Sequence, residues 1–449
     1  MCGFPKIKFT PARVLVIGFA CLILIGALLL TLPLASKDGQ SLRFIDALFT
    51  ATSAVCVTGL VVVDTGTCFS RFGQSVIIVL IQIGGLGFMT FSTLVAMIFG
   101  KKIGLKERLL IQESFNQFSL AGLVKLIKNV LLLTFIFQFF GGLVLSIRFL
   151  LNYSPGRALA FGFFHAVSAF CNAGFDLFGQ VSGPFSSLSS YTNDWLVNLT
   201  IGGLFVIGGL GFPVLVELFK YPTLRNLSLH SKLVLRLTLI LIIVGSFLIF
   251  IFEYDNDQTL AKLDLSGKIL GSFFQSITSR TAGFNTLDFS QFRAGTWFII
   301  IILMFIGASP TSTGGGIKTT TFGVLLAVVS ATIKGKEDVE ILERRFPKDL
   351  IYKALTIIVL ALTWVALVTL IMSLIEPFDF IRLLFEVMSA FSTVGLTTGV
   401  TQLLTDASKI LLMASMFIGR IGLLTVMVSL TKDINSPTIK YIEERIIIG

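Results

Sequence analysis

Long apolar stretches alternate with short polar segments along this 449-residue chain. Several stretches approach 20 residues, the length at which an α-helix crosses about 30 Å of hydrocarbon. The most prominent are residues 14–34, 76–99, 196–219, 233–252, 296–307 and 410–430. The pattern predicts an integral membrane protein built from transmembrane helices, because a water-soluble chain could not cover so much apolar surface.

Four short segments within this pattern align with one another without gaps. Each has a phenylalanine ten residues before a glycine, and a leucine or phenylalanine directly after that glycine. The segments are 49–60 (FTATSAVCVTGL), 164–175 (FHAVSAFCNAGF), 273–284 (FFQSITSRTAGF) and 385–396 (FEVMSAFSTVGL). Their even spacing along the chain indicates one unit that occurs four times.

Each unit consists of a long apolar span, the short segment, and a second long span. The short segment is too brief to cross a bilayer as a helix, so we predict a half-helix that enters the membrane and returns as an extended loop. Such a loop is tolerated at membrane depth only inside protein or beside water. Four loops that meet on one axis satisfy this condition, and the negative ends of their half-helices favour a cation.

The predicted fold is therefore an all-α integral membrane protein with four membrane–pore-loop–membrane repeats around a pseudo-fourfold central pore. We expect the repeats to occupy residues 1–100, 101–220, 221–334 and 335–449. The predicted ion filter takes three residues from each repeat, with K⁺ at their backbone carbonyls: Val57, Thr58, Gly59, Asn172, Ala173, Gly174, Thr281, Ala282, Gly283, Thr393, Val394 and Gly395. Glycine suits the last position because it adopts positive φ and adds no side chain to a narrow bore.

Three of the second spans carry a related glycine motif. It lies at residues 83–88 (IGGLGF), 207–212 (IGGLGF) and 418–423 (IGRIGL). Small residues at this spacing let helices approach closely, so we interpret these glycines as packing positions.

The second span of the third repeat is instead interrupted by a polar stretch that reads IGASPTSTGGGIKTTT over residues 306–321. Pro310 and three consecutive glycines cannot sustain a helix, yet apolar sequence continues on both sides. We predict an intramembrane gate loop that blocks the pore below the filter and moves aside, with Gly314, Gly315, Gly316 and Lys318 as its gate residues. A structural kink is the alternative. A phosphate-binding loop would need the spacing GxxxxGKS or GxxxxGKT, which is absent.

Two arginines belong to the predicted pathway or its surroundings. Arg420 lies in the middle of the last span, where an ionisable residue is a functional candidate by default. It either belongs to the gate, by holding the loop or repelling cations, or forms a structural salt bridge. Arg280 precedes Gly283 by three residues, and we expect it to point behind the filter, because a cation facing the ion would oppose conduction. The isolated His165 and His230 favour ordinary packing or surface roles over metal binding.

Composition and charge agree with a membrane protein and predict its orientation. Hydrophobic residues make up 54% of the chain and charged residues 13%, against about a quarter charged in soluble domains. The net charge of +10 comes mainly from basic residues in alternate loops, at 1–13, 100–128, 220–236, 334–353 and 431–449. The positive-inside rule then predicts a multi-pass protein of the cell (plasma or inner) membrane with both termini in the cytoplasm. The charge therefore requires no nucleic-acid partner.

With four membrane–pore–membrane units and one glycine per filter segment, the sequence resembles the superfamily of K⁺ transporters that includes the TrkH, KtrB and plant HKT proteins. Residues 313–321 are similar to the intramembrane gate loop of the KtrB and TrkH proteins, and Arg420 matches the arginine near that loop. A single span before the first pore segment is most similar to the KtrB type. The likeness extends over nearly the whole chain.

This resemblance implies the ion-translocating subunit of a K⁺ uptake system, often assisted by Na⁺ as in symport, with no organic cofactor on this chain. It also implies a homodimer in membrane lipid, in which each protomer holds its own pore, and a cytoplasmic nucleotide-binding regulatory ring of the KtrA type as partner. The basic segments 101–108 and 334–348 extend beyond what helix anchoring needs, so they are expected to receive this ring or to contact lipid headgroups.

Two other functions compete with this interpretation. A secondary transporter of another small solute would also contain broken helices, but its repeats are often inverted, whereas these repeats have parallel topology. An intramembrane enzyme would need paired catalytic groups, and the chain has neither HExxH nor GxSxG, so we expect no enzyme.

Overall fold

The computed structural model describes residues 11–87, 90, 123–221 and 227–430. Within these residues nearly all regular structure is helical, as the apolar pattern predicted. The exception is an antiparallel hairpin formed by β1 (Glu340–Ile341) and β2 (Arg344–Arg345), which lies in the basic segment 334–348.

One arrangement of helices occurs four times along the chain: a long helix, a short pore helix, and a further helix. The long helices are α1 (Pro11–Thr31), α7 (Leu123–Phe149), α12 (Leu229–Glu253) and α16 (Lys348–Ile375). The pore helices are α2 (Phe44–Cys56), α8 (Pro155–Phe170), α13 (Leu265–Thr278) and α17 (Phe380–Phe391). The further helices are α4 (Arg71–Leu86), α10 (Trp195–Gly209), α14 (Ala294–Phe305) and α18 (Asp406–Ile421).

Shorter helices continue or connect these elements. Three of them follow α10, α14 and α18 after a break in the helix: α11 (Phe212–Lys220), α15 (Thr319–Ile333) and α19 (Leu423–Leu430). The others are α3 (Thr65–Cys68), α9 (Gly179–Ser182) and the 3-10 turns η1 (Pro33–Ala35), η2 (Ser189–Tyr191), η4 (Phe289–Gln291) and η5 (Thr401–Leu403).

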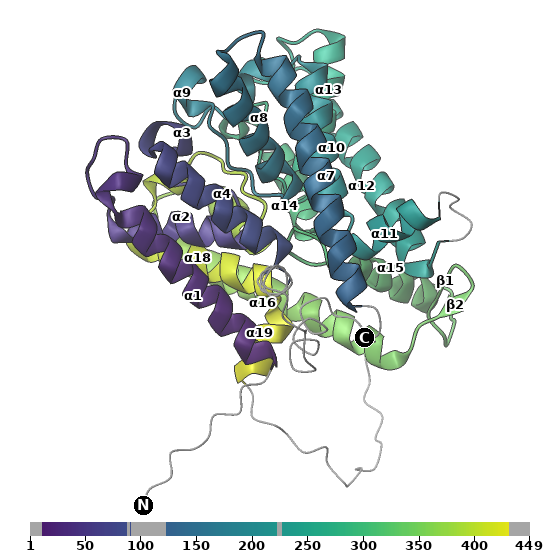
Figure 1. Ribbon diagram of the computed structural model, residues 1–449. Helices are drawn as coiled ribbons and strands as arrows, with labels where there is room; N and C mark the ends of the chain where they lie inside the picture. Colours follow the sequence, from purple (N-terminus) through teal and green to yellow (C-terminus); the bar gives the residue numbers. More distant parts are fainter. Residues whose placement is uncertain (1–10, 88–89, 91–122, 222–226, 431–449) are drawn as a thin grey trace, which may run out of the picture.

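Helix lengths fit the predicted membrane architecture. Among the described residues, α1, α7, α12 and α16 are long and apolar enough to cross a membrane, and two bent pairs raise the number from 4 to 6. The four pore helices are too short to do so. The four units follow one another from the purple first unit to the yellow last unit, which packs against the first through α1, α2, α18 and α19 (Figure 1). This confirms the predicted fold of four membrane–pore-loop–membrane repeats.

Apolar side chains not only form the core but also lie on the outer surface of the long helices. Leu28 on α1, Phe140 on α7, Phe247 on α12 and Leu374 on α16 are all exposed. Hydrocarbon, unlike water, solvates such a surface without cost, so this surface is the one that faces lipid.

Polar caps decide where several helices begin. Asp194 accepts a hydrogen bond from the Val197 amide at the start of α10, and Asp264 accepts one from the Gly267 amide at the start of α13, each at 3.0 Å. Pro155 occupies the first turn of α8, where its missing N–H costs nothing. Such caps satisfy amide groups that the helix itself leaves free.

The last glycine of each motif in the second spans breaks a helix, which corrects our interpretation of these glycines as packing positions alone. Gly87, Gly211 and Gly422 have φ values of 83°, 93° and 96°. The α10–α11 pair bends by 102° at Gly211, and the α18–α19 pair bends by 94° at Gly422. Only glycine takes this left-handed backbone without strain, so it marks the bends.

An earlier glycine of each motif does pack closely, as predicted. A Cβ atom at Gly84, Gly208 or Gly419 would overlap a backbone carbonyl oxygen at the end of a pore helix. The three oxygens belong to Val55, Phe170 and Phe391. The motif therefore sets how closely each second span approaches the pore helix of its own repeat.

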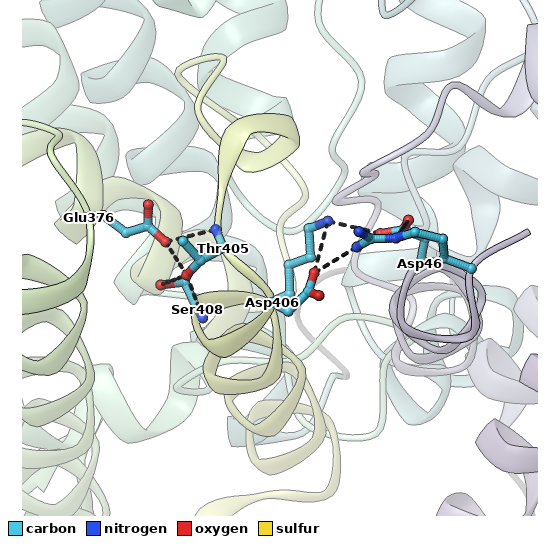
Figure 2. A network of polar contacts seen from close by, with 7 residues as sticks. Asp46, Glu376, Thr405, Asp406 and Ser408 are labelled. Carbon is cyan, nitrogen blue, oxygen red and sulfur yellow. Dashed lines mark hydrogen bonds and ion pairs between the residues drawn. The ribbon is translucent and has the colours of Figure 1, made fainter.

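An ion-pair cluster joins the last repeat to the first. Lys409 on α18 lies 2.8 Å from a carboxylate oxygen of Asp46 on α2 (Figure 2). Arg43 pairs with Asp46 at 3.0 Å and with Asp406 at 2.7 Å. Lys409 and Asp46 are nearly buried, with side chains 8% and 13% exposed. Their pairing closes the ring of repeats at the seam between its two ends.

Glu376, at the end of α16, ties the long helix of the fourth repeat to the start of α18. The amide and hydroxyl of Thr405 both donate to one oxygen of Glu376, at 2.9 and 2.7 Å (Figure 2). Burial raises the pKa of this carboxyl, but hydrogen bonds from Ser408 and Thr405 outweigh burial and lower the pKa below its usual value. The carboxylate therefore stays ionised as a fixed acceptor.

Replacing Lys409 by Met should lower the melting temperature of the purified protein, because Asp46 then stays nearly buried with only Arg43 as its partner. We expect the free energy of unfolding to fall by ~1.5–3 kcal/mol, the range for hydrogen bonds to charged groups. The measurement is thermal unfolding in detergent. Lys336→Met is the matched control, since Lys336 pairs with Glu340 at an exposed site and such pairs contribute ~1 kcal/mol or less. Equal melting temperatures of the two variants would show that the contact between the first and last repeats does not depend on the Lys409–Asp46 pair.

Candidate ion pathway

The four predicted filter segments share one backbone conformation, which begins where each pore helix ends. Their first residues, Val57, Asn172, Thr281 and Thr393, have φ values of 56°, 59°, 74° and 51°. This left-handed conformation costs a non-glycine residue ~1–2 kcal/mol. The same cost at the same position in all four repeats is a feature of the site that we did not predict from the sequence.

Each filter glycine lies against the next repeat. A Cβ atom built on Gly59 would lie 2.5 Å from the carbonyl oxygen of Ala173, one on Gly174 would lie 3.0 Å from that of Ala282, and one on Gly283 would lie 2.6 Å from that of Val394. A Cβ atom on Gly395 would overlap the carbonyl oxygen of Thr58, which closes the circle. The four glycines therefore surround one centre in repeat order. Their φ values lie between 68° and 93°, and all residues of the four segments are buried.

Hydroxyl groups on the pore helices hold these segments in place. The Gly59 amide donates to Ser53 Oγ at 3.0 Å, and the Gly395 amide donates to Ser389 Oγ at 3.1 Å. In the second repeat Ser168 donates to the carbonyl of Phe175 at 2.7 Å. We did not predict this role of the serines, although three of the four aligned segments carry serine at this position.

The chain beyond each glycine is also anchored to its pore helix. His165 accepts a hydrogen bond from the Leu177 amide at 3.2 Å and bonds the Phe161 carbonyl at 2.6 Å. This histidine is therefore a packing residue, as expected, and it links the chain beyond Gly174 to α8. Glu386, nine residues before Gly395 as His165 is before Gly174, accepts from the amide of Thr398 at 2.8 Å. It also accepts from the hydroxyls of Thr397, Thr398 and Thr401. A lone buried glutamate gave no sequence signal of this role.

The second span of the third repeat is interrupted between α14 and α15, as predicted from Pro310 and the glycines. Residues 306–318, here called the third-span loop, are not helical, and Ile306 pairs with Ile317 in an isolated bridge. The loop glycines lie directly against filter residues: a Cβ atom at Gly314 would overlap the hydroxyl of Thr281, and one at Gly315 would overlap that of Thr393. Only glycine permits this approach.

Hydrogen bonds join the third-span loop to side chains of three filter segments. The Gly315 amide donates to Thr393 Oγ1 at 2.9 Å. Thr313 Oγ1 donates to Asn172 Oδ1 at 2.9 Å, and Asn172 Nδ2 donates to Thr281 Oγ1 at 3.2 Å. These three filter side chains, which we call the latch (Asn172, Thr281 and Thr393), therefore connect the loop to the filter.

Arg420 and Lys318 hold the same loop through backbone carbonyls. Arg420 donates to the carbonyl of Thr313 in the loop, and to those of Gly84 and, at 3.1 Å, Gly85 at the end of α4. Lys318 donates to the Gly314 carbonyl at 2.7 Å. Arg420 takes part in none of the ion pairs between described residues, so a structural salt bridge, one of the two alternatives for this residue, is absent from this part of the chain.

A cavity of about 450 Å³ adjoins the third-span loop. Lys318, Lys353 and Arg420 line it, and no Asp or Glu does. Three like charges raise the electrostatic potential in a space of low dielectric constant, which opposes the entry of a cation. The conformation described therefore places the third-span loop against filter residues and three basic side chains around the adjoining cavity.

Arg280 points behind the filter, toward α12, as we expected. Its guanidinium reaches α12, where Nη1 lies 3.5 Å from the carbonyl oxygen of Thr238.

Four pore loops of one chain that meet at a ring of buried glycines define a multi-pass, single-chain pore protein. Comparison with known proteins agrees: the family model described as "TrkH: Cation transport protein" matches residues 14–442. The chain belongs to this family, whose members are cation transporters and not enzymes.

Curated relatives match over almost their full length. The chain is 47% identical to the Ktr system potassium uptake protein B of Bacillus subtilis (strain 168), over 99% of this chain and 98% of that protein. It is 39% identical to the potassium/sodium uptake protein NtpJ of Enterococcus hirae, over 98% of each. The crystal structure of the potassium transporter TrkH from Vibrio parahaemolyticus has the same fold, with a TM-score of 0.74, 16% identity, and coverage of 95% of this chain and 86% of that one.

Proposed function

We propose that this chain is the ion-translocating subunit of a K⁺ uptake system and conducts K⁺ through the ring formed by its four filter glycines. The observation that carries this proposal is the circular arrangement of those glycines, each beside the middle carbonyl of the next repeat. The relatives named as potassium uptake proteins support K⁺ as the ion. Na⁺ is the second candidate ion, as a permeant or symported species, because one relative is named for both.

In this proposal the backbone carbonyls of the filter segments replace water around a dehydrated K⁺. The carbonyls of Thr58, Ala173, Ala282 and Val394 are the ones that adjoin the ring. Ion binding there needs no organic cofactor. Uptake into proteoliposomes, with K⁺ and Na⁺ varied separately, distinguishes K⁺ conduction from a secondary transporter of another solute, which would leave K⁺ flux at background.

Replacing Gly395 by Ser should weaken apparent K⁺ affinity, because the new Cβ atom overlaps the carbonyl of Thr58 and strains a φ of 93°. We expect a loss of about tenfold or more, since ~1.4 kcal/mol corresponds to tenfold in affinity. The measurement is the K⁺ dependence of uptake. Gly156→Ser is the control, since nothing lies within 4 Å of a Cβ atom there. The filter assignment is wrong if Ser at each of the four filter glycines leaves K⁺ kinetics unchanged.

The third-span loop acts as the gate in this proposal, with Gly314, Gly315 and Gly316 as its flexible part. The latch holds it against the filter, while Arg420 holds it to α4 and Lys318 adds positive charge. Opening requires the loop to exchange these partners for water, and the adjoining cavity of about 450 Å³ has room for it.

Weakening the latch should increase K⁺ flux. Thr393→Val removes the acceptor of the Gly315 amide, and a lost hydrogen bond of ~1 kcal/mol moves the balance between closed and open states about fivefold. Val57 already occupies this position in the first repeat, so the backbone accepts valine there. Deletion of residues 314–316 and Arg420→Ala should increase flux as well. The measurement is initial K⁺ uptake per inserted protein.

Thr356→Val is the matched control, because the exposed Thr356 bonds only within α16. Unchanged or lower flux in all three gate variants, in folded and inserted protein, would reject the gate and favour a structural kink.

The remaining features of the proposal concern orientation, repeats and assembly. Both termini lie in the cytoplasm, and the repeats divide near residues 100, 220 and 334; α11 ends at Lys220 and α15 at Ile333, beside two of these boundaries. The functional unit is a homodimer in lipid with a cytoplasmic nucleotide-binding ring of the KtrA type. The "Ktr system" in a relative's name supports a partner subunit of this kind.

The β1–β2 hairpin is the described part of the proposed docking surface, and segment 101–108 lies outside the described residues. Arg345 pairs with Asp338 and Lys336 with Glu340, so the hairpin presents an ordered group of charges. Replacing Arg344 and Arg345 by Gln should abolish co-purification with the ring. The purified variant should then have the mass of the homodimer alone. The control replaces Lys232 and Arg236 on α12. Equal binding by the hairpin variant would place the ring elsewhere and favour lipid headgroups as the contact.

A further inference from the structure

Arg280 is a buried charge with almost no partner. It occupies the position of Cys56, Cys171 and Ser392 in the other repeats, so only the third repeat carries a charge there. The residue is 8% exposed, and its Nε has no hydrogen-bond partner. The one contact of its guanidinium is the long one, 3.5 Å, to the Thr238 carbonyl, and it forms no ion pair with a described residue.

A second unsatisfied polar atom lies beside the first. Thr238 is 7% exposed, and its hydroxyl has no partner either. Arg280 and Thr238 line the same cavity of about 20 Å³, whose other walls are mostly apolar and include no acidic residue. Two buried orphan donors that converge on one cavity indicate an unmatched acceptor, because buried polar groups in native proteins are paired.

The size and depth of the cavity limit what this acceptor is. About 20 Å³ holds a single water molecule or an ion of similar radius. Arg280 follows the C-terminus of the pore helix α13 and is 8% exposed, so protein surrounds it at this depth. A guanidinium at this depth has a large desolvation cost unless an opposite charge accompanies it.

We propose that the cavity between Arg280 and Thr238 binds one small monovalent anion of the chloride class. The guanidinium N–H groups and the Thr238 hydroxyl donate to it, and its charge balances Arg280. Arg280 follows the C-terminus of α13, whose negative end attracts cations to the filter. The guanidinium opposes that attraction, and the bound anion restores it.

The direct test uses bromide as the probe, in crystals of the full-length protein grown with bromide in place of chloride. An anomalous peak within hydrogen-bond distance of the Arg280 guanidinium is expected in the wild type, a weaker one in Thr238→Val, and none in Arg280→Gln. The control is Arg148→Gln, which breaks the ion pair between Arg148 on α7 and Asp194 at the start of α10. This variant should keep the peak. A wild-type cavity without a bromide peak would overturn the proposal and leave a water molecule as its occupant.

A second test rests on the proposed K⁺ function, whereas the bromide test does not require transport. In proteoliposomes, exchanging chloride for gluconate should weaken apparent K⁺ affinity several-fold in the wild type, because gluconate is too large for the cavity. Arg280→Gln should show the same K⁺ affinity in both salts. A bromide peak with no salt effect on the wild type would overturn the link to the filter, and a salt effect that persists in Arg280→Gln would assign it to another site.

Discussion

Every non-helical backbone group inside the membrane must find its partner within the protein, and this requirement organises the whole structure. The filter segments leave their helices at Val57, Asn172, Thr281 and Thr393, and their amides then depend on nearby groups. Ser53 and Ser389 accept from the filter glycines, while Glu386 and His165 accept from the chain beyond. These amides are bonded to protein, whereas the carbonyls of Thr58, Ala173, Ala282 and Val394 adjoin the ring of glycines.

The third-span loop obeys the same requirement in a different way. Its Ser309 and Thr313 amides donate to the carbonyls of Gly209 and Gly208, at 3.0 and 3.3 Å, where α10 ends. The Gly315 amide uses Thr393, and the Thr313 carbonyl uses Arg420. These partners come from other repeats, whereas Lys318 bonds Gly314 and Ile306 pairs with Ile317 within the third repeat itself. A loop that bonds to several repeats at once is sensitive to small shifts of the surrounding helices.

Sequence alone predicted the features that contrast with an apolar background. The four glycines, Pro310 with the loop glycines, and the charge of Arg420 all stand out against long hydrophobic stretches, and the repeat made their positions comparable. The bends at Gly211 and Gly422 were missed because glycine in a membrane helix serves equally for packing. The latch and Glu386 were missed because threonine, asparagine and a single glutamate acquire meaning only from what they contact in three dimensions.

The four repeats of a single chain can carry different side chains at equivalent positions, whereas four identical subunits cannot. The backbone of the filter is nearly fourfold, but the side chains at its first position are valine, asparagine and two threonines. Only the three polar side chains form the latch. They hold the third-span loop, which comes from one repeat, against the filter segments. An identical residue at all four positions would place a fourth polar group where Val57 stands, with no loop atom to meet it. Departure from symmetry at equivalent positions is therefore what lets one loop bond to a nearly fourfold set of segments, and Arg280 is a second such departure.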